Sequence, residues 1–169
     1  MIELKNLEVS LGLSQASLAF SCTAYWCGRK LAVVDCTGRG DEPHVRVVGS
    51  QADFKAATTY AEAQPMTEDG KPAVCQATGK VIYHDLGTWI EHLAAETKHR
   101  QQLSQRVRRW LKKTIAIVDG KVLRFDAVYT PQVRDAILRR HPGAEVLNAM
   151  PFGQVLDRIV AVSYQGQEA

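Results

Sequence analysis

The segment from His84 to Lys113 constrains the fold most, because a helical period runs along its length. Asp85 stands where a helix N-cap is expected. The apolar stripe weakens between Ala95 and Gln102, which leaves two interpretations, one helix with a solvated middle or two helices that meet there. We expect one long amphipathic helix over 84–113, since no Gly or Pro interrupts the weak stretch. The stripe consists of Leu86, Trp89, Ile90, Leu93, Leu103, Val107, Trp110 and Leu111.

Residues 114–125 are predicted to form a β-hairpin directly after this helix. Two runs suited to strands flank the dipeptide Asp119-Gly120. Asp-Gly accommodates the positive φ angles of a type I′ turn, whose twist matches that of two antiparallel strands. This is the strongest local signal in the chain.

A helix-strand-helix segment is predicted over 130–164. Thr130-Pro131 indicates the start of its first helix, and His141-Pro142-Gly143 indicates the end. A short strand is expected at 144–147, and Pro151 is expected to open the last helix.

An antiparallel β-meander of four strands is predicted over residues 1–49. Apolar and polar side chains alternate over 18–26, which is the period of a half-buried strand. The first strand shows a slip of phase near Asn6, and short turns at 27–29 and 37–41 join the later strands.

A helix over 50–63 and a loop over 64–82 are predicted to connect the meander to the long helix. Ser50 precedes a run of helical period and suits the N-cap, with Asp53 near the positive end of the helix dipole. Between Pro65 and Lys80 the chain has two prolines, two glycines and few large apolar residues.

These elements together indicate an α+β protein with a single domain over 1–169. Hydrophobic residues make up 46% of the chain and charged residues 23%, ordinary values for a globular protein. No run approaches the roughly 20 apolar residues of a membrane span, and Met1 to Lys5 do not resemble a secretory leader. We therefore expect a soluble protein of the cytoplasm, with no membrane partner.

The four cysteines are Cys22, Cys27, Cys36 and Cys75, and none belongs to a Cys-x-x-Cys pair. A zinc site would need tightly spaced ligand pairs. Cys27 and Cys36 with His44 are the one alternative that the spacing offers. Buried free thiols that pack as small hydrophobic groups are the favoured interpretation, and we expect no metal and no cofactor.

Residues 98–113 hold seven of the 21 Lys and Arg and no acidic residue. On a helix they form positive ridges beside the apolar stripe, which suits phosphates or an acidic protein surface. The alternative is a solvated face, with cations favoured near the C-terminus of the helix. Arg134, Arg139 and Arg140 would extend the ridge if the two helices are neighbours. The candidate partner-binding residues are Arg100, Arg106, Arg108, Arg109, Trp110, Lys112 and Lys113.

Signatures of catalysis are missing from the sequence. It contains no hydrolase nucleophile elbow, no His-Glu-x-x-His and no kinase signature, and its histidines are scattered. We expect no enzyme and no catalytic residues. An enzyme whose site assembles from distant segments is a third alternative.

The run from Arg139 to Pro151, the start Ile2 to Leu7 and the run Trp110 to Thr114 resemble small uncharacterised proteins of phages and plasmids. In those proteins a helix ends at a Pro, a short strand closes on Leu-Asn, and a Pro opens a final helix. The resemblance covers most of the chain in outline. One departure is the turn over 35–40, where the family has Asn-x-Gly-x-Gly-Gly and this chain has Asp-Cys-Thr-Gly-Arg-Gly.

The resemblance implies a setting in the bacterial cytoplasm, where such accessory proteins often block host defences. CRISPR–Cas complexes are among their targets, and such inhibitors usually act by binding. The resemblance therefore predicts an anti-CRISPR-type inhibitor that binds a host defence protein or ribonucleoprotein complex without catalysis. The alternative is a nucleic-acid-binding accessory protein that uses the basic helix.

Overall fold

The computed structural model describes residues 1–68 and 71–165 and confirms the α+β class. The chain divides into two compact units, Met1–His99 and Arg100–Ala169, and each is described by itself. The expectation of one domain over 1–169 stays a prediction. None of the described helices is long and apolar enough to cross a membrane.

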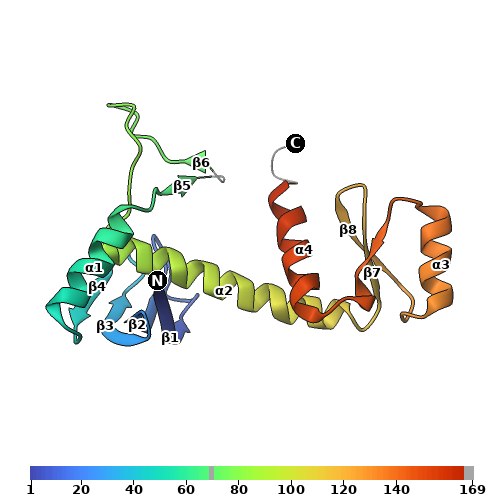
Figure 1. The fold of residues 1–169 in the computed structure, drawn as a ribbon, viewed down its shortest axis with the longest axis horizontal. Helices are drawn as coiled ribbons and strands as arrows, with labels where there is room; N and C mark the ends of the chain where they lie inside the picture. Colours follow the sequence, from blue (N-terminus) through green and yellow to red (C-terminus); the bar gives the residue numbers. More distant parts are fainter. Residues whose placement is uncertain (69–70, 166–169) are drawn as a thin grey trace. The chain divides into compact units, whose positions relative to one another are not determined.

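A four-stranded antiparallel sheet opens the first unit, in the order β1-β2-β3-β4 (Figure 1). The strands are β1 (Ile2–Val9), β2 (Phe20–Trp26), β3 (Arg29–Cys36) and β4 (His44–Val47). The pairing of β1 with β2 shifts register between Lys5 and Glu8, and Asn6 there has a φ of 51°. The predicted meander is confirmed, including the slip of phase near Asn6.

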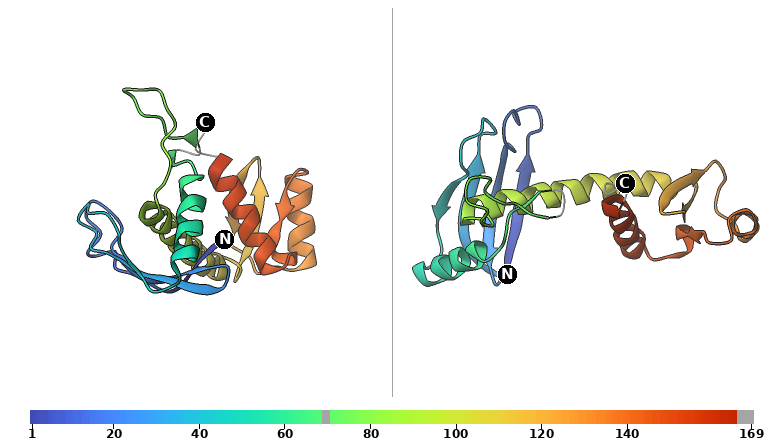
Figure 2. Two further views of the ribbon diagram at one scale, coloured as in Figure 1. Left: turned by 60° about the vertical axis from the view of Figure 1, so that its left-hand side comes forward. Right: turned by 90° about the horizontal axis from the view of Figure 1, so that it is seen from above.

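Helix α1 (Gln51–Glu62) and the first turns of α2 (Leu86–Trp110) cover one face of this sheet (Figure 2). Side chains of the strands and of both helices form one core, because alternate strand residues face the helices. Its fully buried members are Ala24, Leu31, Ala32, Val34, Ala57, Ala61, Ile90 and Ala94. The helix predicted over 84–113 is a single helix that ends at Trp110, and Asp85 accepts the capping hydrogen bond from the Thr88 amide at 2.7 Å.

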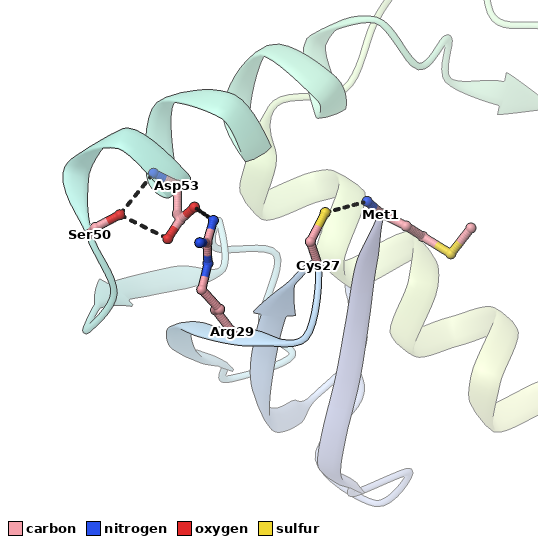
Figure 3. Close-up of polar contacts among 5 residues, drawn as sticks. All are labelled: Met1, Cys27, Arg29, Ser50 and Asp53. Atoms are coloured by element: carbon pink, nitrogen blue, oxygen red, sulfur yellow. Dashed lines mark hydrogen bonds and ion pairs between the residues drawn. The ribbon is translucent and has the colours of Figure 1, made fainter.

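The start of α1 is tied to the β2–β3 turn by polar contacts (Figure 3). Ser50 caps the helix, accepting from the Asp53 amide at 3.1 Å and donating to the Asp53 carboxylate at 2.8 Å. Asp53 also pairs with Arg29 at the start of β3. On the same turn, the amino group of Met1 donates to Cys27 Sγ at 3.4 Å.

The segment predicted as a loop over 64–82 contains short strands, β5 (Thr67–Glu68) and β6 (Lys71–Pro72), which pair with each other. Further bridges join Pro65 to Tyr83 and Val74 to Val81. Two-residue strands in a stretch rich in Pro and Gly are too short for a periodic signal. Residues 69–70 of the predicted loop lie outside the described residues.

The second unit contains the end of α2, strands β7 (Thr114–Val118), β8 (Lys121–Phe125) and β9 (Glu145–Val146), and helices α3 (Pro131–Arg140), η1 (Leu147–Ala149) and α4 (Phe152–Gln165). The sheet order is β8-β7-β9. The predicted hairpin is confirmed, and Asp119 and Gly120 have φ angles of 49° and 70°. The short strand expected at 144–147 covers only Glu145–Val146 and continues into η1.

All five residues of β7 are buried, because helices cover both faces of the sheet (Figure 1). Ile115 and Ile117 pack in a cluster with residues of α2 and α4, whereas Ala116 and Val118 pack with Ile137 of α3. Asn148 of η1 fixes the start of the strand. Its side chain accepts from the Ile115 amide at 2.7 Å and donates to the Lys113 carbonyl at 2.8 Å.

The cysteines are free, and two of them fit the expected role of buried thiols. Cys22 and Cys36 are buried, and burial raises the pKa of the Cys22 thiol to about 11. Cys27 is exposed, which corrects the expectation for that residue. The alternative zinc set is wrong: within residues 1–68 and 71–165, no group of three His, Cys, Asp or Glu could hold a metal ion. Cys27 precedes β3 and Cys36 is its last residue, so the length of an eight-residue strand separates them.

Candidate functional site

Two cations of the predicted basic ridge form ion pairs with acidic residues of the second unit. Arg100 pairs with Asp157 of α4 at 2.7 Å, and Lys113 pairs with Asp126. Exposed pairs of this kind contribute about 1 kcal/mol or less to stability. Each pair offsets the charge of its cation, whereas Arg106 and Arg109 form no ion pair with the described residues.

Arg108 belongs to α2, whereas Lys112 follows the end of the helix at Trp110. The guanidinium of Arg108 lies over the ring of Phe152, 5.1 Å from its centroid. Lys112 is exposed and forms no ion pair with the described part of the chain. Neither residue lines the cavity described next.

A cavity of about 340 Å³ on the second unit is lined by Arg106, Arg109, Trp110 and Arg124. The Arg106 guanidinium lies 6.0 Å from the centroid of the Trp110 ring, near the outer limit of a cation–π contact. Arg109 Nε donates to the Gln105 carbonyl at 3.4 Å. No acidic residue lines the cavity, and none of its three arginines pairs with an acid among the described residues.

Helix and strand periodicity bring these four side chains together. Arg106, Arg109 and Trp110 are three and four residues apart, so they are neighbours on the surface of α2. Trp110 is half-buried because its ring also packs against the core formed by α2, β7 and α4. Arg124 lies directly across from Ile115 in the β7–β8 pairing, and Ile115 faces that same core.

Arg124 was not among the residues singled out from the sequence. Strand alternation could have placed it, since Arg124 is two residues from Val122 and therefore points to the same face of the sheet. Val122 packs in the cluster with α2 and α4. Alternation alone does not show which helix covers that face, so the position of Arg124 beside α2 could be identified only from the tertiary packing.

The arginines of α3 do not extend the surface. Helix α3 packs on the face of the sheet opposite to α2 and α4. Arg134 pairs with its neighbour Asp135 at 2.8 Å, whereas Arg139 and Arg140 are exposed on that far face. The two helices are not neighbours, so the condition for a shared patch is not met.

The charges of the two units have opposite sign. Residues 100–169 contain twelve Lys and Arg and six Asp and Glu, a formal charge of +6. Residues 1–99 contain nine and twelve, a formal charge of −3. The total of +3 is therefore the sum of a basic second unit and an acidic first unit.

No protein-family model, curated protein or solved structure matches the chain. The candidate site therefore rests on geometry and charge. The resemblance to phage and plasmid proteins stays a prediction, as does partner binding by each of the seven predicted residues.

A second polar cluster lies in the first unit, around His84. His84 is buried, with 7% of the residue exposed, and neither ring nitrogen has a hydrogen-bond partner within the described ranges. The ring centroids of His84 and His92 are 5.3 Å apart, and the His92 ring stacks on Trp89 at 5.1 Å. Burial first, and then the neighbouring His92, lower the pKa of His84 below its usual value, while Asp85 acts in the opposite direction.

Proposed function

We propose that the second unit binds nucleic acid through the surface around Arg106, Arg109, Trp110 and Arg124. The observation that carries the proposal is the convergence of three guanidinium groups from α2 and β8 on one cavity that no acidic residue lines. Guanidinium groups bind phosphate oxygens with paired hydrogen bonds, so a phosphate backbone matches this arrangement. The expected activity is binding without catalysis.

Phosphates fit this surface better than an acidic protein does. Protein interfaces depend on a well-packed apolar centre in which aromatic anchors are surrounded by weaker contacts. Here a single half-buried indole lies among three cations. The charge of +6 on residues 100–169 also favours a polyanion. The geometry thus supports the nucleic-acid alternative over the protein partner that the resemblance suggests.

The dependence of affinity on salt tests this proposal. Labelled DNA and RNA oligonucleotides are titrated with the full chain at several salt concentrations. The logarithm of the association constant should fall linearly with the logarithm of salt, by about 0.7 to 0.9 per phosphate contact. Replacing Arg124 with Gln should weaken binding and reduce the slope by about one unit. The matched control is Arg139→Gln, which makes the same charge change on the opposite face of the sheet. It should alter the affinity and the salt slope far less.

The losses of affinity on substituting single residues of α2 distinguish phosphate recognition from protein recognition. For phosphates, Arg106→Gln and Arg109→Gln should weaken binding by comparable amounts, because each cation contributes a similar contact. A protein partner would concentrate its energy in one or two anchors such as Arg109 or Trp110. No retardation of any oligonucleotide at low salt would contradict the nucleic-acid proposal.

A host defence complex remains the second candidate, and the resemblance supports it. A ribonucleoprotein target would present RNA to the same basic surface, so the two hypotheses share the site. Plaque assays in CRISPR-immune cells that express the chain test this candidate. Protection that is lost in Arg124→Gln but kept in Arg139→Gln would link defence inhibition to the cavity. Absence of protection across a broad panel of defence systems would contradict the inhibitor hypothesis.

A further inference from the structure

The cavity on the second unit combines cations with an aromatic ring, and phosphate binding alone does not require the ring. We infer that the cavity takes an unpaired base of single-stranded nucleic acid, with Trp110 as the stacking surface and Arg109 and Arg124 beside it for the neighbouring phosphates. This inference rests on the proposed function and names the form of nucleic acid. Aromatic stacking with flanking cations is the usual way in which proteins hold single strands without reading their sequence.

Trp110 is positioned for this role by its two environments. One part of the indole packs into the core of the second unit, which fixes the orientation of the ring. Another part lines the cavity. A ring that is already held loses little conformational freedom when a base stacks on it, so more of the stacking energy appears as affinity.

Arg106 leaves room for a base at the ring. Its guanidinium carbon lies 6.0 Å from the ring centroid, at the outer limit of a cation–π contact, so a base would displace only a weak contact. A base can approach the ring while this long side chain turns toward a phosphate, or can stack on the guanidinium plane itself. The volume of about 340 Å³ is at the lower end of the range for small-ligand sites, which suits one nucleotide.

The extent of the positive surface favours a short single strand over a duplex. Arg100 and Lys113, which precede and follow the cavity residues of α2 in the sequence, pair with Asp157 and Asp126. A duplex also keeps its bases stacked on one another, so an indole in a cavity can reach only its ends. A flexible strand of a few nucleotides can place one base in the cavity and two phosphates on the arginines.

The test compares three probes on the unaltered full chain by fluorescence anisotropy. They are a labelled oligothymidylate of about 12 nucleotides, within the usual site sizes for single-strand binding, an abasic oligomer of equal length, and a duplex of equal length. We expect the oligothymidylate to bind on the order of five- to a hundredfold more tightly than the abasic oligomer, the range for stacking of one base. The duplex should bind more weakly than the oligothymidylate.

Substitutions at Trp110 then assign the difference to the ring. Trp110→Leu should reduce oligothymidylate affinity to near that of the abasic oligomer, while Trp110→Phe should retain most of the preference. Circular dichroism first shows that each variant is folded. If Trp110→Leu unfolds, the probe comparison on the unaltered chain still decides the question.

The outcomes separate this inference from the proposed function. Equal affinity for the oligothymidylate and the abasic oligomer, or tighter binding of the duplex, would overturn the single-strand inference and leave nucleic-acid binding intact. A preference for the oligothymidylate that persists in folded Trp110→Leu would overturn the role of the ring. Failure of all three probes to bind at low salt would overturn the proposed function itself.

Discussion

The first unit has a four-stranded sheet with helices on one face, whereas the second has a three-stranded sheet with helices on both faces. The two units also differ in formal charge, which is −3 over residues 1–99 and +6 over residues 100–169. The more acidic unit encloses a buried, unpartnered histidine, and the more basic unit presents arginines around an open cavity. On this contrast we expect the second unit to carry the proposed anion binding, and the first unit to lose stability on acidification through His84.

The largest expected effects come from removing core side chains, and they test whether the units unfold separately. Leu31 and Ile115 are fully buried in clusters that share no residue. Leu31→Ala and Ile115→Ala should each lower the free energy of unfolding by about 2–5 kcal/mol. In calorimetry, each substitution should move only the transition of its own unit. A single transition that both substitutions shift would instead support the predicted single domain.

Next in size is a loss of stability in the first unit on acidification. The pKa of His84 is lowered in the folded chain, mainly by burial. The unfolded chain therefore takes up a proton at His84 near pH 6.5, before the folded chain does. The contribution of neutral His84 to the free energy of unfolding is fully present above that pH, and it decreases as the pH drops toward the folded pKa.

Melting temperatures measured from pH 7.5 to 5 check this expectation. His84→Phe should flatten the pH dependence of the first unit, because Phe keeps a buried ring without a titratable group. The control is His99→Gln, an exposed histidine of the same unit, which should leave the pH dependence unchanged. A profile that is equally steep in His84→Phe would show that other groups control it.

A smaller effect compares matched charge changes in the two units. Arg124→Gln removes a cation that lines the cavity, and Lys55→Gln removes an exposed cation from α1. Loss of a charged hydrogen bond to phosphate should weaken oligonucleotide binding about tenfold at low salt. Lys55→Gln should change affinity by about twofold or less, through net charge alone. Equal losses in binding titrations would mean that net charge, and not the cavity, determines affinity.

The smallest expected changes in stability come from substitutions at the helix caps, and the caps of the two units make different numbers of polar contacts. Ser50 caps α1 within the Asp53–Arg29 contacts, whereas Thr130 caps α3 through one hydrogen bond to the Val133 amide at 3.2 Å. Loss of a cap costs about 0.5–2 kcal/mol. Ser50→Ala should fall in the upper half of that range and Thr130→Ala in the lower half, measured by urea denaturation. The reverse order would show that the Arg29 contact adds no stability.

Local signals predicted most of the fold. Ser50, Asp119-Gly120 and the phase slip at Asn6 each specify the backbone through their own neighbours in sequence, and the structure agrees at all three. The candidate site was less predictable because distant residues decide it. Asp126 and Asp157 neutralise two cations of the basic stretch, and the β7–β8 register places Arg124 at the cavity. The two ion pairs have no periodic signal in the sequence, and strand alternation gives the face on which Arg124 lies but not the helix that covers it.

Strand β7, which is buried on both faces in the folded chain, is exposed to solvent before the chain folds. Thr114–Val118 has high β propensity and no charge, which is the composition of a segment that self-associates when exposed. Lys112 and Lys113 precede it and Asp119 follows it, and charges in such flanking positions oppose the stacking of copies. We therefore expect Lys112 and Lys113 to oppose aggregation of this strand before α2, α3 and α4 cover it.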